Sequence, residues 1–328
     1  MNLPDFVQIE PVGQCNLACK MCPVVLREEK PPAFMGFEVF CSLLEQFPAM
    51  KQLHLQGLGE PLLHPRFFDM VRHAARRGIE VSTNSNLTAL SERRAEACVK
   101  SGLARLHVSL DAAEAAAYEY IRVGARFDKV LRNLGWLNEA KQRLRAPRPE
   151  IGLVAVAMRR NLEQLPALVR LAHAYRAHSL SVQRLAHDFS ESSLPPRYRS
   201  MREFVDRETL DHEDPARVQR WFDEARAAAA ELGITLRLPN VSPQPRPASV
   251  KGRSRCDWPW RGAYIAYSGE AMPCCMVATP DRKNFGSMSR DGVVQVWNNA
   301  AYRQFRERLD SDHPPDICRG CAVYQGKF

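Results

Sequence analysis

The sequence predicts an α/β fold, a partial (β/α)6 barrel of the TIM type followed by a small C-terminal region with a β-hairpin and a helix. Two observations support this. Short apolar runs alternate with longer segments of helical spacing up to residue 185, which is typical of parallel β/α units. Polar residues also follow these runs, where the strands of a barrel carry functional groups. These residues are Cys15, Glu60, Asn84, Asp111 and Gln183.

Six apolar runs are candidates for the barrel strands, and helical segments separate them. The strand candidates are FVQIEPV (6–12), KQLHLQG (51–57), IEVSTNSN (79–86), ARLHVSLD (104–111), IGLVAVAM (151–158) and SLSVQRL (179–185). The helix candidates are GFEVFCSLLEQF (36–47), FFDMVRHAARRG (67–78), LSERRAEACVKSG (90–102), FDKVLRNLGWLNEAKQRL (127–144) and LEQLPALVRLAHAYRA (162–177).

The chain after residue 185 has a different pattern. A loop-like stretch precedes an amphipathic helix candidate at 215–233, and a segment rich in Pro and Ser follows at 238–255. Hairpin character then appears, with Ser268-Gly269 as the turn, before a last helix candidate at 301–309. We therefore predict three parts: 1–185 as the barrel, 186–250 as a helical connection and linker, and 251–328 as a cysteine-rich domain.

Composition limits the compartment and the partners. No segment has the roughly 20 apolar residues of a membrane span, and the N-terminus lacks the regions of a signal peptide. We therefore expect a cytoplasmic protein without membrane contact, in which thiols stay reduced. The net charge of +9 comes from arginines scattered over predicted helix faces, without interleaved aromatic residues. We expect no nucleic-acid partner.

Eight of the ten cysteines fall into three groups, which in a reducing compartment are typical of metal ligands or reactive thiols. The groups are Cys15/Cys19/Cys22, Cys256/Cys274/Cys275 and Cys318/Cys321. The first group has the spacing C-x3-C-x2-C, directly after the first strand candidate. A structural zinc site needs a fourth ligand nearby, and Cys41 and His54 are poorly placed to supply it. A [4Fe–4S] cluster held by three cysteines would leave one iron free.

The stretch CNLACKMC resembles the cysteine loop of the radical S-adenosylmethionine (SAM) enzymes. The resemblance implies that SAM binds the free iron of a [4Fe–4S] cluster held by Cys15, Cys19 and Cys22. The cluster would then cleave SAM reductively to a 5′-deoxyadenosyl radical, which abstracts a hydrogen atom from a substrate C–H bond. A reduced flavodoxin or ferredoxin is the electron donor that this chemistry implies.

Further segments match the same family in order along the chain. GLGEP (57–61) resembles the turn that meets the SAM amino group, which implies contacts from Gly59 and Glu60, although Leu58 replaces the usual first glycine of that motif. By the same resemblance, Ser82 and Asn84 are expected near the SAM ribose, with Ser109 at the end of the fourth strand. Arg122 stands where relatives place an arginine that pairs with the SAM carboxylate.

The C-terminal cysteines alone would also suit zinc. The pattern C-x12-G-x4-C followed by CRGC nevertheless resembles the Twitch and SPASM domains of radical SAM enzymes. This implies a second, auxiliary [4Fe–4S] cluster on Cys256, Cys274, Cys318 and Cys321, with a role in electron transfer because no iron would be free. Cys275 is then a surplus thiol: a buried cysteine, an alternative ligand, or a catalytic hydrogen-atom donor, as a cysteine serves in related epimerases.

The substrate is less constrained than the chemistry. The first strand candidate starts within ten residues of Met1, from which we expect no N-terminal peptide-recognition domain. This favours dehydrogenation or epimerisation of a small polar, sugar-like metabolite over modification of a peptide or protein side chain. We expect His187, Asp188 and Glu191 to face that substrate. The competing functional class is a non-enzymatic binding protein stabilised by zinc. This class does not explain why a three-cysteine loop is followed by the sequence GEP (59–61) after the second strand candidate.

Overall fold

One curved sheet organises the protein. The computed structural model describes residues 2–27, 33–244, 256–277 and 279–328, and within them the sheet has nine strands in the order β7-β6-β5-β4-β3-β2-β1-β8-β9. The strands are β1 (Phe6–Ile9), β2 (Gln52–Leu55), β3 (Glu80–Ser85), β4 (Arg105–Ser109), β5 (Glu150–Ala157), β6 (Ser179–Arg184), β7 (Thr235–Arg237), β8 (Gly262–Ile265) and β9 (Ala271–Met272). The strands β1–β6 coincide with the six predicted runs and pair in parallel, which confirms the partial barrel.

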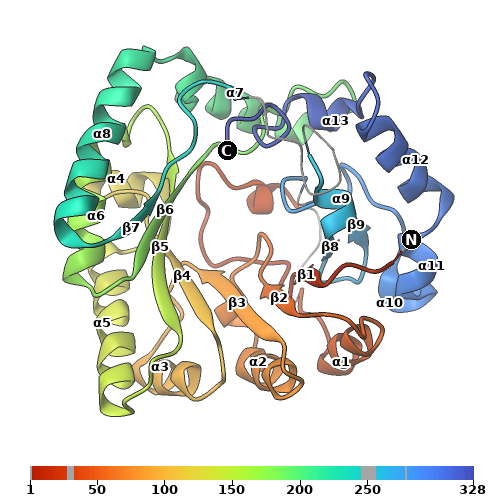
Figure 1. The fold of residues 1–328 in the computed structure, drawn as a ribbon, viewed down its shortest axis with the longest axis horizontal. Coiled ribbons are helices and arrows are strands. Elements are labelled where there is room, and N and C mark those ends of the chain that lie inside the picture. Colours follow the sequence, from red (N-terminus) through yellow and green to blue (C-terminus); the bar gives the residue numbers. More distant parts are fainter. Residues whose placement is uncertain (1, 28–32, 245–255, 278) are drawn as a thin grey trace.

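Most helices up to residue 174 and the helix of residues 215–232 cover the convex face of this sheet, whereas the helix of residues 199–208 lies on the opposite side (Figure 1). The helices of the described residues differ in length. The longer ones are α1 (Phe37–Glu45), α2 (Phe67–Arg76), α3 (Glu92–Val99), α4 (Ala115–Ile121), α5 (Phe127–Arg143), α6 (Leu165–Ala174), α7 (Arg199–Glu208), α8 (Pro215–Leu232) and α12 (Ala300–Leu309). The shorter ones are α9 (Trp258–Arg261), α10 (Met288–Asp291), α11 (Val293–Trp297) and α13 (Asp316–Arg319). The sequence analysis predicts neither α4 nor α7, and it interprets residues 187–201, which include the start of α7, as a loop.

The two faces of the barrel strands differ in polarity, because alternate side chains of a strand point to opposite faces. Val7, Leu53 and Val81 are fully buried against the helices. Their neighbours in the chain point into the barrel, and the register aligns Gln8 with His54 and His54 with Ser82. The interior of the barrel is therefore polar, and His54 lies there with its pKa lowered by burial to about 4.

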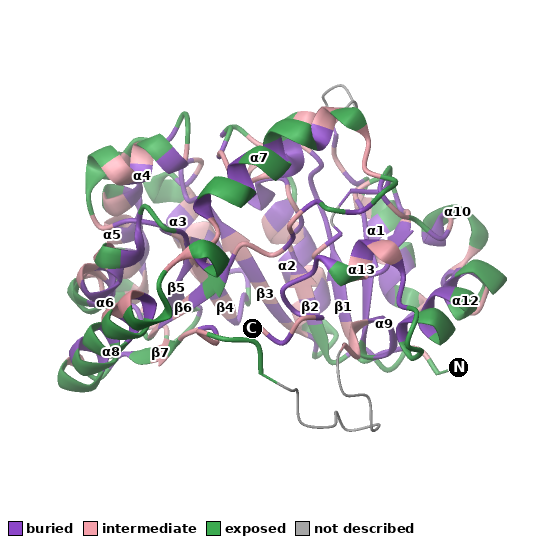
Figure 2. Cartoon of the chain, turned by 90° about the horizontal axis from the view of Figure 1, so that it is seen from above, coloured by how far each residue is buried: buried purple, intermediate pink, exposed green. Residues whose placement is uncertain are grey.

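The C-terminal region extends the sheet beyond β1. Strand β8 pairs in parallel with β1, and β9 pairs antiparallel with β8 around the predicted turn, where Gly269 has a φ of +90°. The Trp297 indole donates to the Asn2 carbonyl at 3.2 Å, and the Val293 amide donates to Gln46 Oε1 at 2.9 Å. Val7, Ile265 and Trp297 belong to one cluster of buried side chains, so the core of the barrel continues into this region. Figure 2 shows buried residues in both parts.

The predicted division at residues 185 and 250 stays a prediction, since α7, α8 and β7 are continuous with the barrel and 245–255 lie outside the described residues. In the part of the chain that the structure describes, no helix combines the length and the apolar character needed to cross a bilayer.

Candidate active site

The three cysteines of the N-terminal loop line one cavity of about 180 Å³ at the carboxyl ends of the first four strands. The loop is fixed to the segment after α4, because the Ala18 amide donates to the Val123 carbonyl at 2.9 Å and the Lys20 amide to the Ile121 carbonyl at 3.0 Å. Five of the predicted cofactor-binding residues also line the cavity. They are Gly59, Glu60, Asn84, Ser109 and Arg122.

The three thiols fit an iron–sulfur cluster by their chemistry and spacing. Burial raises the pKa of Cys15 to about 11 and that of Cys22 to about 12, so the thiolates need a cation that the protein does not supply in full. Metal coordination deprotonates a thiol outright. A [4Fe–4S] cluster with three thiolate ligands therefore fits the cysteines that line this cavity.

The turn 57–61 accepts glycine alone at two of its positions. A Cβ on Gly57 would lie 2.3 Å from the Glu10 side chain, and a Cβ on Gly59 would lie 1.9 Å from the Val12 carbonyl oxygen. Leu58 lies between them and is accommodated. The departure from the family motif at this residue therefore leaves the close approach of the turn to the cysteine loop intact.

Replacement of Gly59 by alanine is expected to abolish SAM binding, because the new methyl group meets backbone atoms that cannot move without displacing the cysteine loop. Equilibrium dialysis with SAM measures this loss. Gly135→Ala in α5 is the control, since a Cβ there meets no atom within 4 Å. This control should keep SAM binding and stabilise the fold by about 0.5–1 kcal/mol. Unchanged SAM binding by Gly59→Ala would contradict the placement of the turn.

A buried ion pair that the sequence analysis missed supports this turn. Arg27 contacts both Glu10 carboxylate oxygens at 3.1 Å, and the two side chains are 4% and 0% exposed. Glu10 Oε1 also accepts from the amides of Leu58 at 2.8 Å and Gly59 at 3.3 Å. The pair therefore joins the end of β1, the segment after Cys22 and the 57–61 turn. The available signal was an acidic residue at the end of a buried strand.

The carboxylate of Glu60 is occupied by groups of the protein itself. Oε1 accepts from Ser85 Oγ at 2.6 Å and from the Leu62 amide at 3.0 Å, and Oε2 accepts from the Asn86 amide at 2.8 Å. Glu60 thus ties the turn to the end of β3 and is 3% exposed. The predicted contact of Glu60 with the SAM amino group stays a prediction. Because the carboxylate already accepts three hydrogen bonds from the protein, the backbone of the turn is the group available for this contact.

Arg122 supplies a fixed positive charge at the cavity. Its Nε lies 2.7 Å from Asp111 Oδ2, and its Nη1 lies 3.9 Å from Cys19 Sγ. Burial alone would lower the pKa of Arg122, but Asp111 and Cys19 outweigh it and raise the pKa above its ordinary value. The guanidinium is therefore a permanent cation, as the predicted pairing with the SAM carboxylate requires.

Ser82 does not line the cavity with the other predicted residues. Its hydroxyl lies 2.8 Å from His54 Nδ1, deeper in the barrel, because it is two residues before Asn84 on the same strand. Asn86, which the sequence analysis did not select, lies closer to the thiols. Its Nδ2 is 3.6 Å from Cys15 Sγ and 3.2 Å from Asn16 Oδ1.

The structure brings the remaining four predicted ligands together at a second cavity. Cys256, Cys274, Cys318 and Cys321 line it among apolar side chains such as Phe305 and Ile317. Burial raises the pKa of Cys274 and Cys318 well above the ordinary range of a thiol. Four desolvated thiols around one apolar cavity fit a fully coordinated [4Fe–4S] cluster.

Cys275 is not among the described residues that line either cavity, although Cys321 and Cys256 are near enough to contribute to its raised pKa. It packs with Trp258 against Tyr264, Ala266 and Met272, and burial raises its pKa to about 12. This position is typical of an inert buried thiol. The role of hydrogen-atom donor stays a prediction, which a Cys275→Ala protein that forms product at normal rates would remove.

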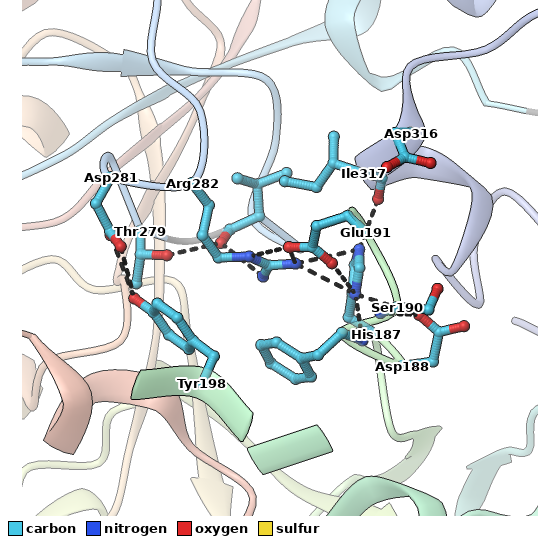
Figure 3. Close-up of polar contacts among 12 residues, drawn as sticks. His187, Asp188, Ser190, Glu191, Tyr198, Thr279, Asp281, Arg282, Asp316 and Ile317 are labelled. Atoms are coloured by element: carbon cyan, nitrogen blue, oxygen red, sulfur yellow. Dashed lines mark hydrogen bonds and ion pairs between the residues drawn. The ribbon is translucent and has the colours of Figure 1, made fainter. Parts of the chain in front are cut away.

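The expectation that His187 and Glu191 face a substrate is wrong. Their side chains are 2% and 1% exposed, and both contact Arg282, a residue that sequence reasoning did not connect with them (Figure 3). Only Asp188 of the three predicted residues is partly exposed, and its Oδ1 accepts from the Ser190 amide at 2.9 Å.

Comparisons with known proteins agree with this geometry. The family model of the radical SAM superfamily matches residues 9–172, and that of an iron–sulfur cluster-binding domain, SPASM, matches residues 256–322. A cofactor-modifying protein for tungsten-containing aldehyde ferredoxin oxidoreductase from Pyrococcus furiosus is 24% identical over 97% of this chain and 87% of its own. A PqqA peptide cyclase from Xanthomonas euvesicatoria is 27% identical over 97% of this chain and 80% of its own.

Solved structures show the same fold at low sequence identity. SuiB of Streptococcus suis bound to SAM superimposes with a TM-score of 0.72 at 15% identity, over 99% of this chain and 72% of SuiB. SuiB bound to its precursor peptide SuiA gives 0.70. BtrN in complex with SAM and 2-DOIA gives 0.53 at 16% identity, over 98% of this chain and 94% of BtrN. The chain belongs to the radical SAM superfamily, and it carries a C-terminal SPASM iron–sulfur domain.

Proposed function

We propose that this radical SAM enzyme abstracts a hydrogen atom from a side chain of a peptide or protein. The support comes from the PqqA peptide cyclase, which is similar over almost the whole chain. SuiB supports the same substrate class, because its structure with a precursor peptide superimposes with a TM-score of 0.70, compared with 0.53 for BtrN. The sequence analysis favoured a small polar metabolite as the substrate. BtrN, whose structure contains 2-DOIA, supports that alternative, with the lower TM-score.

The observation that carries the radical SAM chemistry is the convergence of three thiols, the 57–61 turn and Arg122 on one cavity. When bound, SAM and the cluster on Cys15, Cys19 and Cys22 supply a 5′-deoxyadenosyl radical that abstracts the hydrogen atom. Arg122 binds the SAM carboxylate, and the backbone of the turn orients the SAM amino group. Asn84 and Ser109 offer hydrogen bonds to the ribose from the ends of β3 and β4.

The auxiliary site has a separate task in this proposal. Cys256, Cys274, Cys318 and Cys321 hold the second cluster, and four thiol ligands leave no iron free for a substrate. We therefore assign electron transfer to this auxiliary cluster. A reduced flavodoxin or ferredoxin is the external electron donor of the enzyme. A side chain that loses a hydrogen atom to the 5′-deoxyadenosyl radical, then an electron to the auxiliary cluster and a proton to a base or to water, ends as a dehydrogenated or cross-linked product.

Deuterium transfer tests the substrate class even while the substrate itself is unidentified. Cells that carry the gene are grown on deuterated medium, and their extract is divided into a peptide fraction and a small-metabolite fraction. Each fraction is incubated anaerobically with the enzyme, SAM and a reductant. We expect deuterium in 5′-deoxyadenosine with the peptide fraction and none with Cys19→Ala enzyme. Deuterium from the small-metabolite fraction alone would contradict the proposal and favour a metabolite dehydrogenase.

A further inference from the structure

A buried ion pair lies directly behind the auxiliary cavity. The Arg282 Nε donates to Glu191 Oε1 at 2.7 Å, and both side chains are 1% exposed (Figure 3). Arg282 comes from the segment that follows the Cys274-Cys275 pair, whereas Glu191 comes from the loop after β6. The pair therefore joins the barrel to the region that holds the second set of cysteines.

Two residues of the cavity wall contact this arginine. The Arg282 Nη2 lies 3.3 Å from the His187 ring nitrogens, and Nη1 lies 3.4 Å from the Val277 carbonyl oxygen. Both His187 and Val277 line the cavity with the four cysteines. One layer of side chain and backbone therefore separates the guanidinium from the space that the auxiliary cluster would fill.

The hydrogen bonds of His187 fix the intervening ring as neutral. Its Nδ1 accepts from the Phe189 amide at 2.9 Å, and its Nε2 lies 2.6 Å from the carbonyl oxygen of Ile317, the residue before Cys318. A ring nitrogen that accepts an amide hydrogen carries no proton, so Nε2 is the donor. His187 adds no charge to the cavity wall, and the charges behind it are those of Arg282 and Glu191.

Aromatic packing keeps water away from the pair and holds it in place. The guanidinium lies 4.6 Å from the centroid of the Phe189 ring and 5.9 Å from that of Tyr198. The Tyr198 hydroxyl donates in turn to Asp281, the neighbour of Arg282, at about 3.1 Å. Charges in such a dry, rigid environment act on their surroundings more strongly than exposed charges do.

The reduction potential of an iron–sulfur cluster depends on the net charge near it, on hydrogen bonds and on exposure to solvent. We propose that the Arg282–Glu191 pair is a positioning and tuning element that sets the reduction potential of the auxiliary cluster. Arg282 stabilises the more negative, reduced cluster, and Glu191 opposes it. The inference depends on the assignment of Cys256, Cys274, Cys318 and Cys321 as cluster ligands and not on the substrate.

Two single variants test this, because their effects have opposite signs. Glu191→Gln leaves the arginine charge uncompensated and is expected to raise the midpoint potential of the auxiliary cluster. Arg282→Gln removes the cation and is expected to lower it. Asp291→Asn is the control from the same region, since the side chains of Arg290 and Asp291 in its ion pair are 76% and 42% exposed and screened by water, so the potential should not change.

The midpoint potentials are measured by redox titration of the reconstituted full-length protein, followed by EPR spectroscopy. The cluster whose signal changes on addition of SAM is the N-terminal one, and its potential should stay the same in all three variants. Equal potentials of the auxiliary cluster in the wild type and Glu191→Gln, or shifts of the same sign in both variants, would overturn the inference. A wild type with one cluster would overturn the ligand assignment and the inference together, while leaving SAM cleavage intact.

Discussion

Replacement of Cys19 by alanine is expected to lower the iron content from about eight to about four atoms per chain and to reduce 5′-deoxyadenosine formation to background. Cys19 is 7% exposed and faces the cavity shared with Cys15, Cys22 and Arg122. Loss of one of three ligands leaves two thiols, which cannot retain a cluster with an iron free for SAM. Iron and sulfide analysis of the reconstituted protein and chromatography of the nucleoside product measure both effects.

A matched control comes from a cysteine outside both cavities. Cys98 is 1% exposed in α3, and burial raises its pKa to about 12. Cys98→Ala removes a buried thiol of the same size and should keep the full iron content and SAM cleavage. Cys19→Ala protein with normal iron and undiminished 5′-deoxyadenosine formation would show that the N-terminal cluster is held elsewhere.

The largest effect on stability is expected for Glu10→Ala. The change leaves the Arg27 guanidinium buried without its carboxylate, which typically costs about 3–5 kcal/mol of unfolding free energy. It also removes the acceptor of the Leu58 and Gly59 amides, so SAM affinity should fall as the turn loosens. Urea unfolding of the reconstituted protein under anaerobic conditions measures the first effect, and equilibrium dialysis with SAM measures the second.

An exposed ion pair provides the comparison. Glu96 pairs with Lys100 four residues away in the chain, and the two side chains are 37% and 58% exposed. Water screens both charges of such an exposed pair, so Glu96→Ala should change the unfolding free energy little. Equal destabilisation by Glu10→Ala and Glu96→Ala would refute the structural role of the buried pair.

The barrel could be predicted from sequence because its signal is local. Each of β1–β6 is a short apolar run next to a helix of regular spacing, and all six lie where the runs do. The seventh parallel strand, β7, has only three residues, and its pairing with β6 depends on the preceding helix α8. A three-residue run carries too little pattern to separate it from a loop.

The grouping of seven cysteines at two cavities could also be predicted, because their spacing in the chain matches the cluster motifs that the sequence resembles. The partners of the charged residues could not. Glu191 and Arg282 are 91 residues apart, and their contact depends on how the loop after β6 packs against the C-terminal region. Sequence reasoning therefore placed Glu191 at a substrate, whereas tertiary packing gives it an internal partner. Glu60 is similar: its motif was recognised, but the three donors around its carboxylate come from the fold.

The iron and sulfide content of the wild type, with its SAM cleavage activity, tests the central claim most directly. The protein is reconstituted anaerobically and incubated with SAM and a reductant in the absence of substrate. About eight irons, an equal amount of sulfide and slow formation of 5′-deoxyadenosine are expected from two [4Fe–4S] clusters, one of them bound to SAM. Zinc in place of iron, without SAM cleavage, would contradict the account.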